Sequence, residues 1–240
     1  MIKLDIISDP VCPWCYIGKA NLDRALTNAP DHPFAIEWHP FQLNPEMLPE
    51  GMDRREYLET KFGGREAAVK VYGQIEDAAR AAGLEIDFAA IKTTPNTINA
   101  HRLIHWAGIE GRQTAVVSAL FKAYFVEGRD IGATKVLLDI AEQCGMDSTM
   151  VQTLLDGDSD LAETRARDAH ARERGVTGVP TFVVANQHVL PGAQPPELWA
   201  QVIQDIAQQL AAQDDSTAEG VDTGEADSDT PTTPTNGSGA

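Results

Sequence analysis

The sequence predicts an α/β fold in which a βαβ half and a ββα half are separated by about 130 residues of helix. Strand-like patterns occur only near the two ends of the chain, and helical patterns follow one another between them. A strand, a helix and a second strand lie within the first 43 residues, the order of a βαβ unit with a right-handed crossover. We therefore expect two halves that contain strands, with a large all-helical insertion between them.

The βαβ half begins with residues 2–8, IKLDIIS, an apolar run typical of a buried strand. Residues 11–27 follow a helical pattern, in which Leu22 and Leu26 lie one turn apart on an apolar face. Apolar and polar residues then alternate through 32–43, which predicts the second strand.

The insertion, residues 44–174, contains no strand pattern. Its helical patterns cover about 53–62, 64–82, 95–109, 112–127, 134–143, 147–156 and 160–174. Thr94 and Pro95 predict a helix start, because a threonine hydroxyl can cap the first turn and a proline at the first helical position loses no hydrogen bond. Gly145 follows a pattern at the point where a left-handed residue ends a helix.

The ββα half begins after the insertion. Strand patterns at 181–185 and 188–192 flank Asn186 and Gln187, which predicts a hairpin with its turn at these two residues. Residues 195–212 form a closing amphipathic helix, because apolar side chains recur there every four residues.

The charge of the chain restricts its partners. The formal net charge is -17, and residues 213–240 hold seven acidic residues and no Lys or Arg. We expect this tail to be disordered, since it has almost no apolar residue to bury. The acidity argues against nucleic-acid or anionic membrane partners, both of which need clustered cations. The first residues lack a signal-peptide pattern and no stretch is apolar enough to span a bilayer, so we expect a cytoplasmic protein.

Three cysteines are present, and two of them form a CxxC pair, Cys12 and Cys15. Cys12 lies at the predicted helix start, where the helix dipole favours a thiolate, and Pro13 suits the first helical position. Cys15 lies one turn further on. We expect Cys12 to be an exposed nucleophile, Cys15 a buried resolving thiol, and Trp14 an apolar cover for the sulfurs. Cys144 has no cysteine neighbour in sequence, and we expect a buried apolar role for it.

Two other interpretations of the pair stay open. Both cysteines could be buried small apolar residues, although a proline between them at a strand-to-helix turn argues against this. A metal site would need a second ligand pair, for which His101 and His105, four residues apart on one predicted helix, are the candidates. Histidines at this spacing are more often solvated or packed residues, so we expect no metal.

The sequence GVPTF places Pro180 just before the strand at 181–185. An X–Pro bond is the realistic place for a cis peptide, and a cis bond from Val179 would leave the backbone N–H and C=O of that residue free to pair with a substrate chain. The alternative is an ordinary trans turn proline. His39, on the second strand, is a further residue that could border this site, with a structural role as the alternative.

These features together resemble the DsbA family of thioredoxin-fold oxidoreductases. The sequences DPVCPWCYIG, HPFQLNP and TGVPTFVV are similar to the FrnE-like branch of that family. The resemblance covers about residues 1 to 211 and implies a thioredoxin-like fold. Its thioredoxin-like domain would comprise 1–43 and 175–212, and 44–174 would be a helical insertion domain.

The resemblance also implies roles. Cys12 would be the nucleophile, Cys15 the resolving thiol and Pro180 a cis proline, with Pro13, Trp14 and Val179 in contact with substrate. The activity implied is that of a thiol–disulfide oxidoreductase or isomerase with a redox-active disulfide and no bound cofactor. Its partners would be protein or small-molecule disulfides and a cellular reductant, and the chain could form a homodimer. Trp14 stands where better-known members have histidine, which predicts a less oxidising site.

Two rival functions remain. The architecture is also similar to 2-hydroxychromene-2-carboxylate isomerases and kappa-class glutathione transferases, which have a serine in place of Cys12 and bind glutathione near the cis proline. Glutathione is therefore a candidate co-substrate, and Asn96, Asn99 and His101 in TPNTINAHR would then face a small-molecule cleft. A capped core helix is the alternative for this segment. The second rival is a chaperone-like binder that uses the apolar surface around Trp14.

Overall fold

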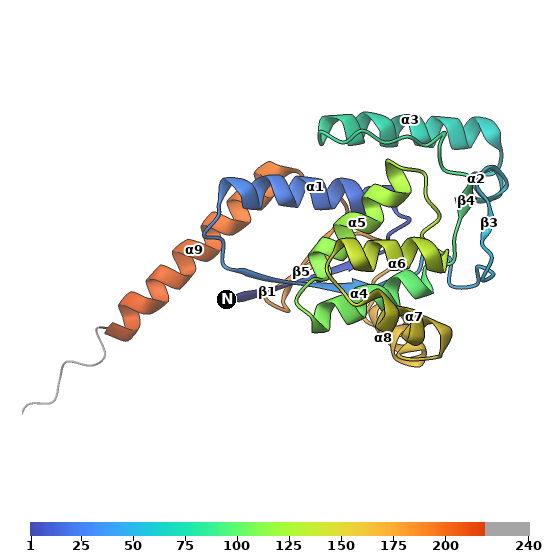
Figure 1. The fold of residues 1–240 in the computed structure, drawn as a ribbon. Coiled ribbons are helices and arrows are strands. Elements are labelled where there is room, and N and C mark those ends of the chain that lie inside the picture. The colour runs from blue at the N-terminus through green and yellow to red at the C-terminus, as the bar shows by residue number, and fades with distance from the viewer. Residues whose placement is uncertain (219–240) are drawn as a thin grey trace, which may run out of the picture.

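The computed structural model describes residues 1–218, with side chains described as far as residue 212 (Figure 1). The larger part of the predicted disordered tail, 219–240, lies outside the described residues. None of the described helices is long and apolar enough to cross a bilayer.

The predicted sheet is present, and both ends of the chain contribute to it. Its strand order is β2-β1-β5-β6, where the strands are β1 (Ile2–Ser8), β2 (Phe34–Pro40), β5 (Thr181–Val184) and β6 (His188–Pro191). β1 is parallel to β2 and antiparallel to β5, which is antiparallel to β6. β1 is therefore the central strand that joins the two halves, and it is buried from Leu4 to Ser8.

Two helices cover one face of this sheet, α1 (Pro13–Asn28) and α9 (Pro196–Ala218), and they contact each other (Figure 1). The face that these helices cover is the one that carries the side chain of Phe182 in β5. Its ring packs edge-on against Trp199 of α9, with ring centroids 4.8 Å apart. A Cβ added at Gly18 of α1 would lie 3.3 Å from the Phe182 ring. α1 therefore packs so closely on the sheet that a larger residue at position 18 would disturb this packing.

The insertion between β2 and β5 contains seven described helices. They are α2 (Arg54–Phe62), α3 (Arg65–Ala81), α4 (Ile98–Ile109), α5 (Gln113–Phe125), α6 (Thr134–Gln143), α7 (Ser148–Asp156) and α8 (Leu161–Glu173). The insertion shares a core with the sheet domain: the ring of Tyr16 in α1 stacks on Phe121 and Phe125 of α5, with centroids 5.2 and 5.6 Å apart. This is the α/β thioredoxin-like architecture, with the helical insertion, that the sequence predicted.

One helix begins later than the sequence predicted. α4 starts at Ile98 instead of residue 95, because Thr94 pairs with Met52 in a two-stranded ladder of β3 (Met52–Asp53) and β4 (Thr93–Thr94). The capping role passes to Asn96, whose Oδ1 accepts a hydrogen bond from the Ile98 N–H at 2.9 Å. The ladder was missed because each strand has only two residues.

Two features of the C-terminal half also differ from the prediction. The hairpin turn has three residues, 185–187, instead of two, and Ala185 and Asn186 both have positive φ. The helix predicted to end at 212 continues to Ala218, so the first residues of the predicted disordered tail are helical. Each residue added to an existing helix gains a backbone hydrogen bond, which lets the helix propagate into a polar segment.

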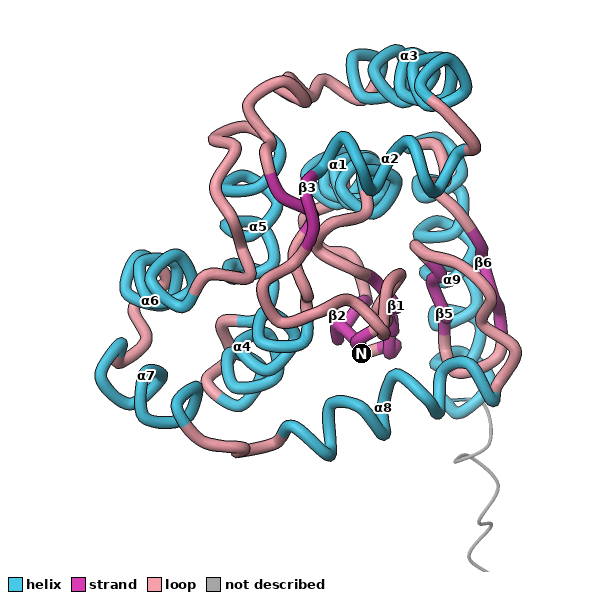
Figure 2. The backbone as a smooth tube through the Cα atoms, turned by 90° about the vertical axis from the view of Figure 1, so that its right-hand side faces the viewer, coloured by secondary structure: helices cyan, strands magenta, loops and turns pink. Residues whose placement is uncertain are grey.

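α8 lies on the other face of the sheet, opposite α1 (Figure 2). It packs against β2. β1, β5 and β6 contribute residues to a groove on the side of the sheet where α8 lies.

Candidate active site

The two cysteines of the CxxC pair occupy the start of α1. Cys12 is the residue before the first helical turn, with extended backbone, and Pro13 is the first helical residue. The Cys12 N–H donates to the Asp9 carbonyl at 2.9 Å, and the Cys15 N–H donates to the Cys12 carbonyl at 3.1 Å. These bonds hold both thiols at the positive end of the helix dipole, as the sequence predicted.

The exposure of Cys12 differs from our expectation. Its side chain is buried, with the residue only 4% exposed, and Cys15 is 1% exposed. The Cys12 thiol donates a hydrogen bond to the carbonyl oxygen of Val179 at 3.5 Å, so a loop from the other end of the chain lies against it. Trp14 is 39% exposed. Both cysteines are free thiols in this structure.

The loop facing Cys12 contains a cis Val179–Pro180 peptide bond, which confirms the predicted cis geometry. A Cβ added at Gly18 would be 3.1 Å from the Pro180 ring, so this loop packs tightly on α1. Within residues 1–218, the Val179 N–H donates no hydrogen bond. The Val179 carbonyl, which belongs to the cis peptide, therefore faces the cysteine, and the Val179 N–H, which belongs to the preceding peptide bond, is a free donor.

The two thiols have different electrostatic surroundings. Burial raises the pKa of the Cys15 thiol well above its ordinary value, and its hydrogen bond with Cys12 raises it further. The Ser8 side chain and the Asp9 backbone N–H also contact this thiol and lower its pKa in part. Cys15 is therefore held as a neutral thiol that needs a base before it can react.

The remaining predicted site residues lie on or next to α4. Asn96 bonds inside the protein, donating to the Met47 carbonyl at 2.6 Å and accepting from Gln42. Asn99 accepts a hydrogen bond from Arg102 at 2.9 Å. Neither lines the groove described below. His101 is buried, and its Nε2 lies 3.7 Å from Oδ1 of Asp9 in the loop that carries Cys12.

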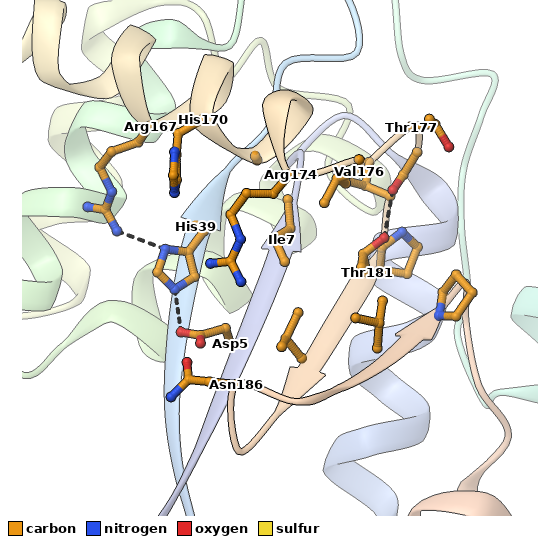
Figure 3. A pocket seen from close by; sticks show the side chains of 18 of the residues that line it. Asp5, Ile7, His39, Arg167, His170, Arg174, Val176, Thr177, Thr181 and Asn186 are labelled. Carbon is orange, nitrogen blue, oxygen red and sulfur yellow. Dashed lines mark hydrogen bonds and ion pairs between the residues drawn. The ribbon is translucent and has the colours of Figure 1, made fainter.

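A groove of about 1100 Å³ borders the Val179–Pro180 loop. It lies between the sheet and α8, and Figure 3 shows Arg167, His170 and Arg174 directed from the helix toward the strands that carry Asp5 and Ile7. Arg174 makes no ion pair with any described residue. The sequence analysis did not predict this groove. The three basic residues are nevertheless spaced at i, i+3 and i+7, which is the spacing of one helix face.

His39 forms part of one end of this groove, as the sequence suggested it could. Its Nδ1 accepts a hydrogen bond from Arg167 at 3.0 Å, and its Nε2–H donates to Asp5 (Figure 3). Burial lowers the pKa of His39, and the neighbouring carboxylates only partly offset this. The imidazole is therefore neutral, with one nitrogen an acceptor and the other a donor.

A set of three possible metal ligands, Asp5, Glu37 and His39, lies at the same place. Lys3 bridges the two carboxylates, with its Nζ 2.9 Å from Asp5 and 3.0 Å from Glu37. Arg167 contacts Glu37 at 3.2 Å. These cations already supply the positive charge that a metal ion would provide, so the donor set suits an ion-pair network.

Cys144 ends α6 and is only partly buried, in contrast to the buried role that we expected. Burial raises the pKa of its thiol, and nearby Arg112 lowers it in part. Arg112 donates to the Cys144 carbonyl at 2.9 Å, and the Cys144 side chain packs against the edge of the hydrophobic core.

Comparison with known proteins identifies the architecture. The family model described as DSBA-like thioredoxin domain matches residues 3–204. Protein YwbO of Bacillus subtilis is 27% identical over 205 residues, which are 85% of this chain and 96% of that protein. The crystal structure of probable DsbA oxidoreductase SCO1869 from Streptomyces coelicolor matches with a TM-score of 0.76 and 29% identity, over 85% of this chain and 89% of that one.

A structure of 2-hydroxychromene-2-carboxylate isomerase also matches, with a TM-score of 0.68 over 88% of this chain and 98% of that one. Its sequence identity is 16%, so this similarity is one of fold alone.

Proposed function

This chain belongs to the DSBA-like thioredoxin domain family, and we propose that it is a thiol–disulfide oxidoreductase whose reactive groups are Cys12 and Cys15. The observation that carries the proposal is the position of the Cys12 thiol, at the start of a helix and 3.5 Å from the carbonyl of the cis Val179–Pro180 peptide. The substrates are disulfides of proteins or of small molecules.

The reduction of a substrate takes two exchange steps. The Cys12 thiolate attacks one sulfur of the substrate disulfide, a mixed disulfide forms, and the other substrate sulfur leaves as a thiolate that takes up a proton. The Cys15 thiol then loses its proton and attacks Cys12. The Cys12–Cys15 disulfide forms, and the second substrate thiol is released. Two electrons pass from the enzyme to the substrate, and the reverse sequence donates a disulfide.

Substrate access requires Cys12 to leave its contact with Val179. The thiol gains a charge when it ionises, and a thiolate no longer donates to a carbonyl oxygen, so ionisation itself weakens the contact. A substrate backbone that pairs with the free Val179 N–H would then lie beside the sulfur. The adjoining groove has room for the residues that flank the reacting substrate cysteine.

No bound cofactor is needed in this scheme, because the two sulfurs carry the electrons. The enzyme disulfide is returned to the dithiol by a cellular reductant, for which glutathione is a candidate. The direction of net reaction is set by the reduction potential of the pair relative to its surroundings.

The proposal is tested by an insulin-reduction assay and by refolding of a scrambled disulfide protein. Wild type is compared with Cys12→Ser and Cys15→Ser, with Cys144→Ser as the matched control. Loss of activity in the first two variants and retention in the third is the expected result. Turnover of a glutathione-linked small molecule by Cys15→Ser would support the glutathione-dependent alternative, and aggregation suppression unaffected by all substitutions would support a binding protein.

A further inference from the structure

His101 has a buried ring nitrogen without a partner. Its side chain is 2% exposed, and its Nε2 makes no hydrogen bond within residues 1–212, where only Trp199 has another such atom. A buried polar atom without a partner is destabilising. Such a nitrogen near Asp9, whose carbonyl accepts from the Cys12 N–H, requires an explanation.

His101 lines a small cavity. Its volume is about 10 Å³, close to the minimum that holds one water molecule. Ser8 and His101 are among its lining residues, together with the apolar side chains of Trp38, Ile104 and Phe121. A single water here would have polar neighbours in an otherwise apolar surrounding.

Asp9 lies near the same nitrogen of His101. It is 0% exposed, and its Oδ1 is 3.7 Å from His101 Nε2. Backbone N–H groups hold its carboxylate in place, Val11 at 3.4 Å and Leu43 at 2.7 Å. The carboxylate of Asp9 is therefore fixed at the Nε2 end of the imidazole.

Ser8 connects this group to the buried thiol. The Ser8 side chain lies close enough to the Cys15 thiol to lower its pKa in part, and Ser8 is also among the residues that line the cavity with His101. Cys15 is 1% exposed, so bulk water does not reach its proton directly. The other titratable groups near His101 are Asp9, 3.7 Å from its Nε2, and His39, which lines the same cavity from β2.

We propose that His101, paired with Asp9, is the internal proton acceptor for Cys15, reached through the Ser8 hydroxyl and one water in the cavity. This inference rests on the proposed function. In the resolving step the Cys15 proton passes through Ser8 and the water to His101 Nε2, the Cys15 thiolate attacks Cys12, and the substrate thiolate leaves with the electron pair of the broken bond. In the reverse direction His101 returns the proton.

The test separates the two exchange steps. Reduced protein that carries Cys144→Ser, so that only Cys12 and Cys15 can react, is mixed with 5,5′-dithiobis(2-nitrobenzoic acid) in a stopped-flow instrument. Attack by Cys12 releases one coloured thiolate, and resolution by Cys15 releases the second. This protein serves as the wild type of the test and as the background for the substitutions below. In His101→Gln we expect the first release to keep its rate and the second to slow by about 100-fold. The rate of the second release in His101→Gln should then rise in proportion to hydroxide, because a base from solution must take the proton, while the wild-type rate should depend less on hydroxide. His105→Gln, one turn along α4, is the matched control and should behave as wild type.

Thermal unfolding shows whether His101→Gln is folded. If it is not, Ser8→Ala provides a second variant. It interrupts the same path and should slow only the second release. An unchanged second release in a folded variant, or equal slowing of both releases, would overturn the relay. A wild type that releases one equivalent, as Cys15→Ser must, would instead overturn the proposed function. The two failures are therefore distinguishable.

Discussion

The thiol of Cys12 lies 3.5 Å from the carbonyl oxygen of Val179, although 167 positions separate the two residues in sequence. This contact joins the βαβ half of the chain to the ββα half at the reactive sulfur. It also explains why Cys12 is buried at the start of a helix, where an exposed residue was expected. Substitutions that move either side of the contact should therefore affect stability and exchange together.

Gly18 sets the distance between α1 and the Val179–Pro180 loop. A Cβ there would lie 3.1 Å from the Pro180 ring and 3.4 Å from the Ala193 backbone, so Gly18→Ala should lower the free energy of unfolding by about 1–3 kcal/mol. Urea unfolding measures this change, and the rate of disulfide exchange should fall with it. Gly73→Ala is the control, because a Cβ at that position on α3 meets no atom within 4 Å and should stabilise the helix by about 0.5–1 kcal/mol. Equal effects of the two substitutions would contradict the packing argument.

His39 should make stability depend on pH. The pKa of His39 in the folded protein lies below its ordinary value of 6.5. The unfolded chain therefore binds a proton at this residue more readily than the folded protein does. This contribution is complete above about pH 6.5 and is lost as the pH falls through the folded-state pKa. Urea unfolding at pH 7.5 and 5.5 should show a smaller loss for His39→Gln than for wild type. The same pH dependence in both proteins would refute this assignment.

Arg174 should favour substrates with acidic residues near the reacting cysteine. In a chain of net charge -17, the groove beside Val179 has a wall formed by Arg167, His170 and Arg174. For a peptide disulfide flanked by aspartates, Arg174→Gln should raise KM about two- to fivefold with little change in kcat, and added salt should reduce the difference. Arg165→Gln, on α8 outside the groove, serves as the control. A KM that does not distinguish aspartate from lysine flanks would rule out this role.

The three thiols should differ in their alkylation. Cys15 is 1% exposed and burial raises its pKa, so it should be the last to react with iodoacetamide in the native protein. Cys144 is partly exposed and should react before it, while Cys12 should react faster once substrate analogues displace the Val179 contact. Mass spectrometry of peptides after timed quenching measures each site. Early modification of Cys15 in folded protein would show that its burial is transient.

Local patterns were sufficient to predict much of this fold. The apolar run of 2–8 and the alternation in 32–43 correspond to β1 and β2, and a helix does begin just after Cys12. The cis bond before Pro180 was also expected from sequence, because only proline makes such a bond accessible. Periodicity, capping and proline chemistry depend on neighbours within a few residues, which is why these features can be recognised without the structure.

Contacts between segments that lie far apart in the sequence determine the features that local patterns did not predict. No local pattern shows that Thr94 pairs with Met52, that Val179 buries Cys12, or that His101 comes within 3.7 Å of Asp9. Each depends on how the insertion folds back onto the sheet, and burial or a missing hydrogen-bond partner exists only once that packing is complete. The sequence by itself was sufficient to recognise the CxxC pair. The protection of the pair from solvent, and the proton route that we propose, depend on the three-dimensional arrangement. The reason is that spacing along the chain does not determine distance in space.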